Sequence, residues 1–280
     1  MHAYAMSENE LGQPKTEPAE SELVLNIRRI SLELSKTDVQ NTAEYANSPL
    51  QQLRADSQTF IKGVGDVSLE YNKNRFFWDN SLFAEYGKTS ISPYNNAKTY
   101  NENADRFLAS SYLSYAVYQT EGLNFGPIAR MQYETEFTSN PGAPRLNVVR
   151  SNTGLSLFNH SIIKSLYITG VYEYDFTYEY TSINKLAAEL GWRLEYELRE
   201  GVKFSTNGYY REFLFHSHFL GVDLERDFNA IVRMDTNLWN NFTMGPYLQY
   251  RRALSREADV YGSNLMVGVS FNYITKFGLR

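Results

Sequence analysis

Apolar and polar side chains alternate with a period of two residues through most of this 280-residue chain. The stretch 184–198 shows the pattern most clearly, because its even positions from Leu186 to Leu198 are apolar. Lys185, Glu189 and Arg193 lie at odd positions of the same stretch. A strand places alternate residues on opposite faces, whereas a helix would scatter these charges all round its axis. The alternation therefore predicts an all-β fold.

Twelve segments of this kind follow one another from residue 22 onward, and they predict an antiparallel sheet of about twelve strands. Most are about 12–15 residues long, whereas strands of soluble proteins are usually about 5–6. A tilted strand needs about 9–11 residues to cross the hydrocarbon of a membrane. The lengths therefore favour an antiparallel transmembrane β-barrel with a polar lumen. The predicted strands are 22–35, 59–72, 76–88, 105–119, 124–137, 147–159, 165–178, 184–197, 202–214, 224–238, 242–255 and 262–276.

The connections between these segments alternate between short turns and longer loops. The segments 36–58, 89–104 and 138–146 are long and rich in Asn, Ser, Pro and Gly. Bacterial outer-membrane barrels have short periplasmic turns and longer external loops, and an even number of strands leaves both termini in the periplasm. The first strand changes phase at Arg28-Arg29, which predicts a β-bulge there.

The chain divides into a short tail and one large domain. Residues 1–21 are predicted to be a disordered periplasmic segment, because prolines and glutamates interrupt it and few of its residues are apolar. Ala3-Tyr4-Ala5 has the small-x-small form of a signal-peptidase site and is interpreted as the remnant of an export signal. Residues 22–280 are predicted to form the barrel.

The polar face of the strands carries many charges, and in a membrane barrel this face lines the lumen. A secreted soluble β-protein would place the same charges in solvent. Its core would be only about 10 Å thick, which fits long strands poorly. The 22 tyrosines also gather near strand ends, as in the aromatic belts at membrane surfaces. The predicted lumen-lining residues are Arg106, Arg130, Glu134, Arg150, Glu173, Asp175, Glu189, Arg193, Glu195, Arg211, Asp227, Arg233, Asp235 and Arg251.

The carboxyl-terminal segment Gly268-Val269-Ser270-Phe271-Asn272-Tyr273 resembles the last-strand signal of Gram-negative outer-membrane β-barrel proteins. That signal runs glycine, two residues, aromatic, one residue, aromatic, and here Gly268, Phe271 and Tyr273 match it. The sequence departs from the signal by continuing through residues 274–280. The resemblance implies a barrel of an uncharacterised porin-like family in the bacterial outer membrane. Outer-membrane lipid, lipopolysaccharide and the barrel assembly machinery are the partners it implies.

Composition excludes several other classes. The chain has no cysteine, so it has no disulfide scaffold and no thiol nucleophile. Its net charge of -5 argues against a nucleic-acid partner. No Walker-type loop or metal-ligand pattern occurs, so neither a cofactor nor a metal is predicted.

His216-Ser217-His218 is the one short segment with residues suited to nucleophilic catalysis. A histidine beside a serine can accept the hydroxyl proton, as in hydrolases that use a Ser-His pair. The alternative, that both histidines are ordinary residues of an aromatic rim, is favoured because sequence assigns no third group to orient them. No catalytic residue is therefore predicted beyond these weak candidates.

Three functions remain open at this stage. The first is a narrow passive channel for small polar solutes, whose charged lumen sets its selectivity. The second is a closed structural or surface-interaction barrel, in which arginine–glutamate pairs plug the lumen and function lies in loops 36–58 and 89–104. The third is an outer-membrane lipid hydrolase that uses the rim residues Ser217 and His216 or His218.

Overall fold

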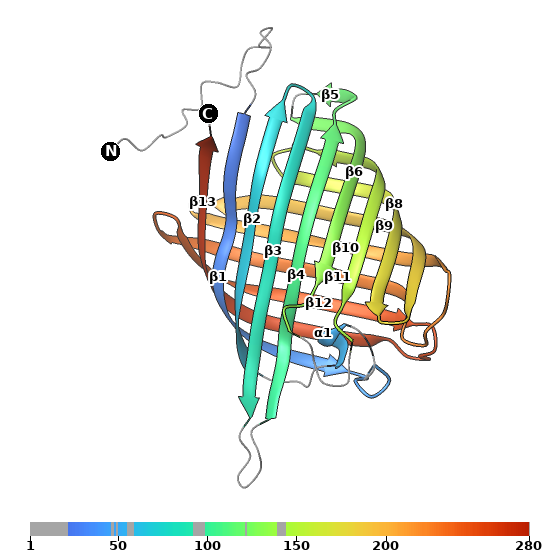
Figure 1. Ribbon diagram of the computed structural model, residues 1–280. Coiled ribbons are helices and arrows are strands. Elements are labelled where there is room, and N and C mark those ends of the chain that lie inside the picture. Colours follow the sequence, from blue (N-terminus) through green and yellow to red (C-terminus); the bar gives the residue numbers. More distant parts are fainter. Residues whose placement is uncertain are drawn as a thin grey trace, which may run out of the picture.

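The computed structural model describes residues 22–45, 48, 50–54, 59–91, 99–120, 122–138 and 144–279. The predicted disordered tail 1–21, with its Ala-x-Ala segment, lies outside these residues. Within them, thirteen strands and one helical turn follow one another (Figure 1). The strands are β1 (Glu22–Gln40), β2 (Thr59–Lys73), β3 (Phe76–Ile91), β4 (Thr99–Tyr115), β5 (Tyr118–Thr120), β6 (Leu123–Thr135), β7 (Asn147–Phe158), β8 (Ile163–Tyr178), β9 (Thr181–Arg199), β10 (Val202–His216), β11 (Leu224–Trp239), β12 (Phe242–Ser255) and β13 (Gly262–Leu279), and the helical turn is α1 (Gln51–Arg54).

The strands form one closed antiparallel barrel. Each long strand pairs with the next along the chain, and β4 pairs directly with β6. The barrel closes where β1 pairs with β13, from Leu23 opposite Leu279 to Gln40 opposite Ser263. The three-residue strand β5 adds only a short pairing with β6. The predicted twelve-stranded antiparallel barrel is therefore confirmed.

The two ends of the barrel differ, as the connection lengths predict. The turn end carries both termini of the barrel and the β2–β3, β7–β8, β9–β10 and β11–β12 turns (Figure 1). Asn74 and Gly201 take positive φ values of 54° and 74° in two of these turns, a conformation that Asn and Gly adopt at low cost. The loop end carries the longer connections. We use the names turn end and loop end throughout.

Two details of the strands refine the sequence prediction. The ladders that β1 forms with β13 and with β2 both shift register after Ile27, so the predicted bulge at Arg28-Arg29 is confirmed. The predicted loops 36–58 and 89–104 are shorter than expected, because β1 continues to Gln40 and β4 begins at Thr99. These extensions are polar and pair by backbone hydrogen bonds, so they leave no hydrophobic signal in the sequence. Figure 1 shows the β3–β4 hairpin projecting beyond its neighbours at the loop end.

The two faces of the barrel wall have opposite chemistry. Most side chains on the outer face are apolar and exposed, and Ile168 on β8 is 61% exposed. The inner face carries most of the buried charged and polar residues. A surface that exposes so many large apolar residues matches a lipid environment. No helix among the described residues is long and apolar enough to cross a membrane.

Candidate functional site

The lumen is the first candidate site, because the strand register brings the predicted charges together inside the barrel. All fourteen predicted lumen-lining residues lie on strands, and all but Arg193, Glu195 and Asp235 have a buried partner in the ladders. They are Arg106 on β4, Arg130 and Glu134 on β6, Arg150 on β7, Glu173 and Asp175 on β8, Glu189, Arg193 and Glu195 on β9, Arg211 on β10, Asp227, Arg233 and Asp235 on β11, and Arg251 on β12.

Glu189 is the centre of the largest group of ion pairs. Its Oε1 accepts hydrogen bonds from Arg130 Nη2 at 2.7 Å and from Tyr167 Oη at 2.9 Å. Its Oε2 accepts one from Arg211 Nε at 2.8 Å. Arg130 lies on β6 and Glu189 on β9, so two strands separate them in the wall. Strands three places apart are about 14 Å apart along a sheet, and the pair therefore bridges two non-adjacent strands through the lumen.

The group continues through five further charged residues. Glu173 pairs with Arg150, at 2.5 Å from Nε, and with Lys185, at 3.3 Å from Nζ. Arg150 also pairs with Glu134, which accepts from Arg106 Nε at 2.5 Å. We call the whole set the charge network. Its members are Arg106, Arg130, Glu134, Arg150, Glu173, Lys185, Glu189 and Arg211.

A second cluster lies against the other wall. Glu33 on β1 pairs with Lys62 on β2 at 3.4 Å and with Arg233 on β11 at 3.3 Å. Lys62 also pairs with Glu85 on β3 at 3.0 Å. The sequence prediction did not include Glu33 and Glu85. The alternation of apolar and polar residues could have identified both, because each is a charged residue between two apolar residues of its strand.

The remaining predicted charges form smaller local pairs. Asp227 accepts from Arg251 Nη2 at 2.8 Å and from Tyr209 Oη at 2.8 Å. Arg233 Nε lies 3.3 Å from Asp235. Asp175 pairs with Lys185 Nζ at 2.8 Å. Each cation thus meets a carboxylate inside the lumen, and charge is balanced locally.

Burial shows that the centre of the charge network is shielded from solvent. Glu189, Glu173 and Arg211 are only 1%, 3% and 5% exposed. Charged side chains that line an open aqueous pore would be wet, because such a pore admits water along its length. Ion pairs among these charges link β4 to β10 along the inside of the wall, and water is largely excluded from the middle of this group.

A cap covers the loop end. We use this name for the described part of the β1–β2 connection, residues 41–45, 48 and 50–54. Tyr45 and Leu53 are fully buried and pack against Ala253. Tyr45 Oη lies 3.0 Å from the carbonyl oxygens of Ala253 and Val260, and it accepts from Ser255 N at 3.1 Å. The helical turn α1 contacts β1, β4 and β13, so the cap reaches across the opening.

The turn end is more open. The side chains of Arg193 and Lys203 are 46% and 54% exposed, and both pair with the same carboxylate, Glu195. Four buried polar atoms on the neighbouring strands β4, β6, β7 and β8 have no hydrogen-bond partner among the described protein atoms. Buried polar atoms of this kind are usually satisfied by internal water. They are Ser114 Oγ, Arg130 Nε, Asn152 Oδ1 and Thr169 Oγ1.

The predicted rim residues do not form a catalytic relay. His216 is buried between the rings of Phe213 and Phe219, and its Nε2 has no partner among the described residues. Ser217 Oγ accepts from Asn184 N at 3.0 Å and lies 3.4 Å from His218 Nδ1. Within the described residues no carboxylate hydrogen-bonds to His218, so the third group of a triad is missing.

The other predicted residues lie on the last strand. Phe271 is on the outer face, and Gly268 packs against the Tyr247 ring and the carbonyl oxygen of Leu34. Tyr273 lies opposite Phe242, and their rings are 5.2 Å apart. Their role in assembly stays a prediction. In the part of the chain that the structure describes, no group of three His, Asp or Glu residues is placed to hold a metal ion.

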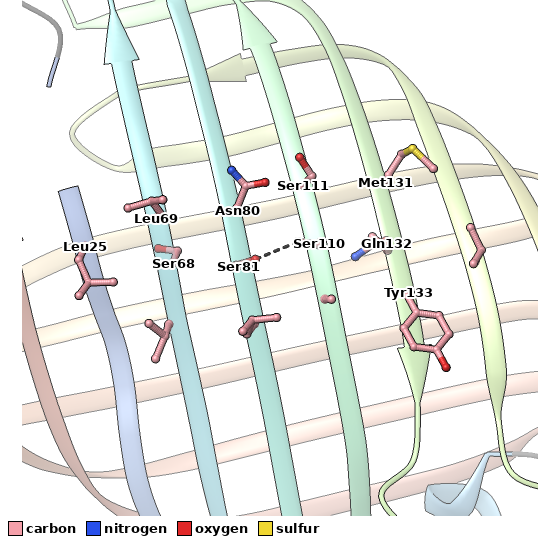
Figure 2. A pocket seen from close by; sticks show the side chains of 14 residues that line it. Leu25, Ser68, Leu69, Asn80, Ser81, Ser110, Ser111, Met131, Gln132 and Tyr133 are labelled. Atoms are coloured by element: carbon pink, nitrogen blue, oxygen red, sulfur yellow. Dashed lines mark hydrogen bonds between the residues drawn. The ribbon is translucent and has the colours of Figure 1, made fainter. Parts of the chain in front are cut away.

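A shallow depression of about 660 Å³ lies on the barrel wall across β1 to β7. Figure 2 shows Leu69, Asn80, Ser111 and Met131 side by side in one row on neighbouring strands. Leu69 and Met131 are exposed, so this is the lipid-facing side of the wall. The depression is therefore separate from the lumen.

Comparisons with known proteins leave the function open. A family described as "Protein of unknown function (DUF3078)" matches residues 54–140. No curated protein matches the chain. Among solved structures, outer membrane phospholipase A from Escherichia coli is 12% identical, with a TM-score of 0.47, and the match covers 88% of this chain and 90% of that one.

Two further structures are similar at the same level. An outer membrane channel from Pseudomonas putida F1 is 12% identical, with a TM-score of 0.46 and coverage of 94% and 100%. The transport unit of the autotransporter AIDA-I from Escherichia coli is 9% identical, with a TM-score of 0.40 and coverage of 95% and 94%. The chain's own architecture is more direct evidence. A closed antiparallel barrel with an apolar exterior and a polar interior is the form of bacterial outer-membrane proteins, and it supports the predicted outer-membrane location.

Proposed function

We propose that this chain is an outer-membrane barrel whose lumen is closed at rest by the charge network and the cap. The burial of Glu173, Glu189 and Arg211 inside the lumen carries the proposal. A barrel sealed in this way does not pass solutes passively. Its interactions then occur at the loop end, which faces the outside when the short turns face the periplasm.

A second function has one specific observation in its favour. Arg193 and Lys203 at the turn end are exposed, and four buried polar atoms on β4 to β8 lack a partner among the described residues, as water-filled sections of a lumen would have. These features support a channel for small polar solutes that conducts only when the charge network separates. The rings of charge in it would set its selectivity.

Planar-bilayer recordings test the closed lumen. We expect the unaltered protein to show no steady conductance. Replacing Arg130, Glu189 and Arg211 together by Ala removes the central ion pairs and leaves none of these three charges without a partner. We expect this triple variant to produce stepwise conductance. The matched control replaces Arg193, Glu195 and Lys203 by Ala, which removes the same number of acids and bases from the section that is already open. We expect no conductance from this control.

Two results would contradict the proposal. Steady single-channel conductance of the unaltered protein would show that the lumen is open at rest. Equal conductance in the two triple variants would show that the charge network is not the seal. Liposome swelling with small sugars, measured on the conducting variant, then tests the channel function separately.

A further inference from the structure

Three arginines stand at the loop end of an otherwise apolar outer wall. Arg226 begins β11, Arg252 lies near the end of β12, and Arg256 follows that strand. Arg252 pairs with Phe228 in the ladder and alternates with the buried Ala253, so it faces outward. We call Arg226, Arg252 and Arg256 the arginine rim. Arginines at the edge of a lipid-facing surface lie at the level of lipid head groups.

Aromatic side chains hold the arginine rim in place. The Arg252 guanidinium lies 4.0 Å from the ring centre of Tyr261, and that of Arg256 lies 3.6 Å from the ring centre of Phe219. Arg226 Nη1 donates to Tyr261 Oη at 3.0 Å. Stacking on a ring fixes the plane of a guanidinium and leaves the N–H groups at its edge free to donate.

Two of the three cations have no counter-charge within the described residues. Arg226 Nε donates to Glu212 at 3.1 Å. Arg252 and Arg256 are exposed and form no ion pair with any described carboxylate, although Glu257 and Asp259 lie in the same connection. This contrasts with the lumen, where each cation described above meets an acid. The arginine rim therefore presents two unneutralised, oriented guanidinium groups to whatever adjoins the wall.

We infer that the arginine rim binds a phosphate group of lipopolysaccharide in the surrounding leaflet. A guanidinium donates two parallel hydrogen bonds to a phosphate, and the pair is strongest where water is partly excluded. The lipid that adjoins an outward-facing rim in the outer leaflet carries its phosphates on a sugar head group at this depth. The inference rests on the proposed orientation of the barrel, with its loop end outside, but not on a closed lumen.

Binding of lipopolysaccharide to the full refolded chain in detergent tests the inference. The probe is a fluorescent lipopolysaccharide, compared with the same lipid after enzymatic removal of its phosphates. Replacing Arg252 and Arg256 together by Gln is expected to weaken binding of the phosphorylated lipid by about tenfold or more. The dephosphorylated lipid is expected to bind both proteins equally weakly.

The matched control replaces Arg75 and Arg199 by Gln, because both are exposed arginines at the turn end. This control is expected to bind like the unaltered protein. Equal affinity of the Arg252/Arg256 variant, or equal affinity for the dephosphorylated lipid, would overturn the inference. Complete displacement by millimolar inorganic phosphate would assign the site to the free ion and overturn the lipid as its ligand. None of these results depends on conductance, so the two proposals fail separately.

Discussion

Individual residues in this barrel depend on partners from distant parts of the chain. Glu189 illustrates this, because Arg130, Tyr167 and Arg211 each donate to its carboxylate. A buried ion pair adds little stability over a well-packed apolar pair, but a single buried charge without its partner is costly. The charge network therefore tolerates concerted changes better than single ones.

A pair of single substitutions tests this dependence. Glu189→Gln leaves Arg130 and Arg211 without their shared carboxylate, and we expect it to lower the free energy of unfolding by about 3–5 kcal/mol. Glu195→Gln is the control, because its partners Arg193 and Lys203 are exposed and the expected loss is about 1 kcal/mol or less. Urea unfolding in lipid vesicles, followed by tryptophan fluorescence, measures both. Equal losses would show that the lumen around Glu189 is hydrated.

Outward-facing residues give a second test at this scale. Ile168→Arg places a charge on the exposed outer face of β8, and we expect a loss of about 2–4 kcal/mol if this position lies near the middle of the bilayer. In a soluble barrel the same change would be neutral or favourable. Tyr180→Arg is the control, since Tyr180 lies in the exposed β8–β9 turn. Equal refolding yields of the Ile168→Arg and Tyr180→Arg variants in lipid vesicles would argue against a membrane barrel.

Among the elements, the cap is the one that the strand pattern does not determine. It adds no strand to the barrel, yet Tyr45 joins it to β12 and to the connection before β13 through one hydroxyl group. Its contacts are few compared with those of a strand in the wall. Segments of this kind open locally with a lower free energy than the core of a fold.

Removing the Tyr45 hydroxyl is expected to loosen the cap alone. Tyr45→Phe leaves Ser255 N and the Ala253 carbonyl without this partner, and we expect a local cost of about 1–3 kcal/mol. Hydrogen exchange should quicken at residues 41–45 and at Ser255, and remain unchanged in β6 to β9. Tyr180→Phe, at an exposed ring, is the control. Faster exchange throughout the barrel would mean that the cap also supports the wall.

Some features of the whole molecule could be predicted from the sequence, and others could not. The twelve strands were predictable because lipid on one side and charges on the other impose a strict alternation on residues such as Leu186 to Leu198. The inward direction of Arg130 and Glu189 follows from the same alternation. The contact between Arg130 and Glu189 inside the lumen does not follow from the alternation, because it depends on barrel closure and on how far each side chain reaches. The position of Tyr45 in the cap is likewise set by packing and carries no periodic signal.

The first and last strands of the barrel hold it closed, since Leu23 pairs with Leu279. Until β13 exists, β1 has a free edge, and a free strand edge in lipid leaves backbone groups without partners. The chain therefore cannot insert stably into the bilayer one strand at a time from its amino terminus. It must remain shielded from water and from other chains until its last residues are present, and the final hairpin decides when the barrel closes.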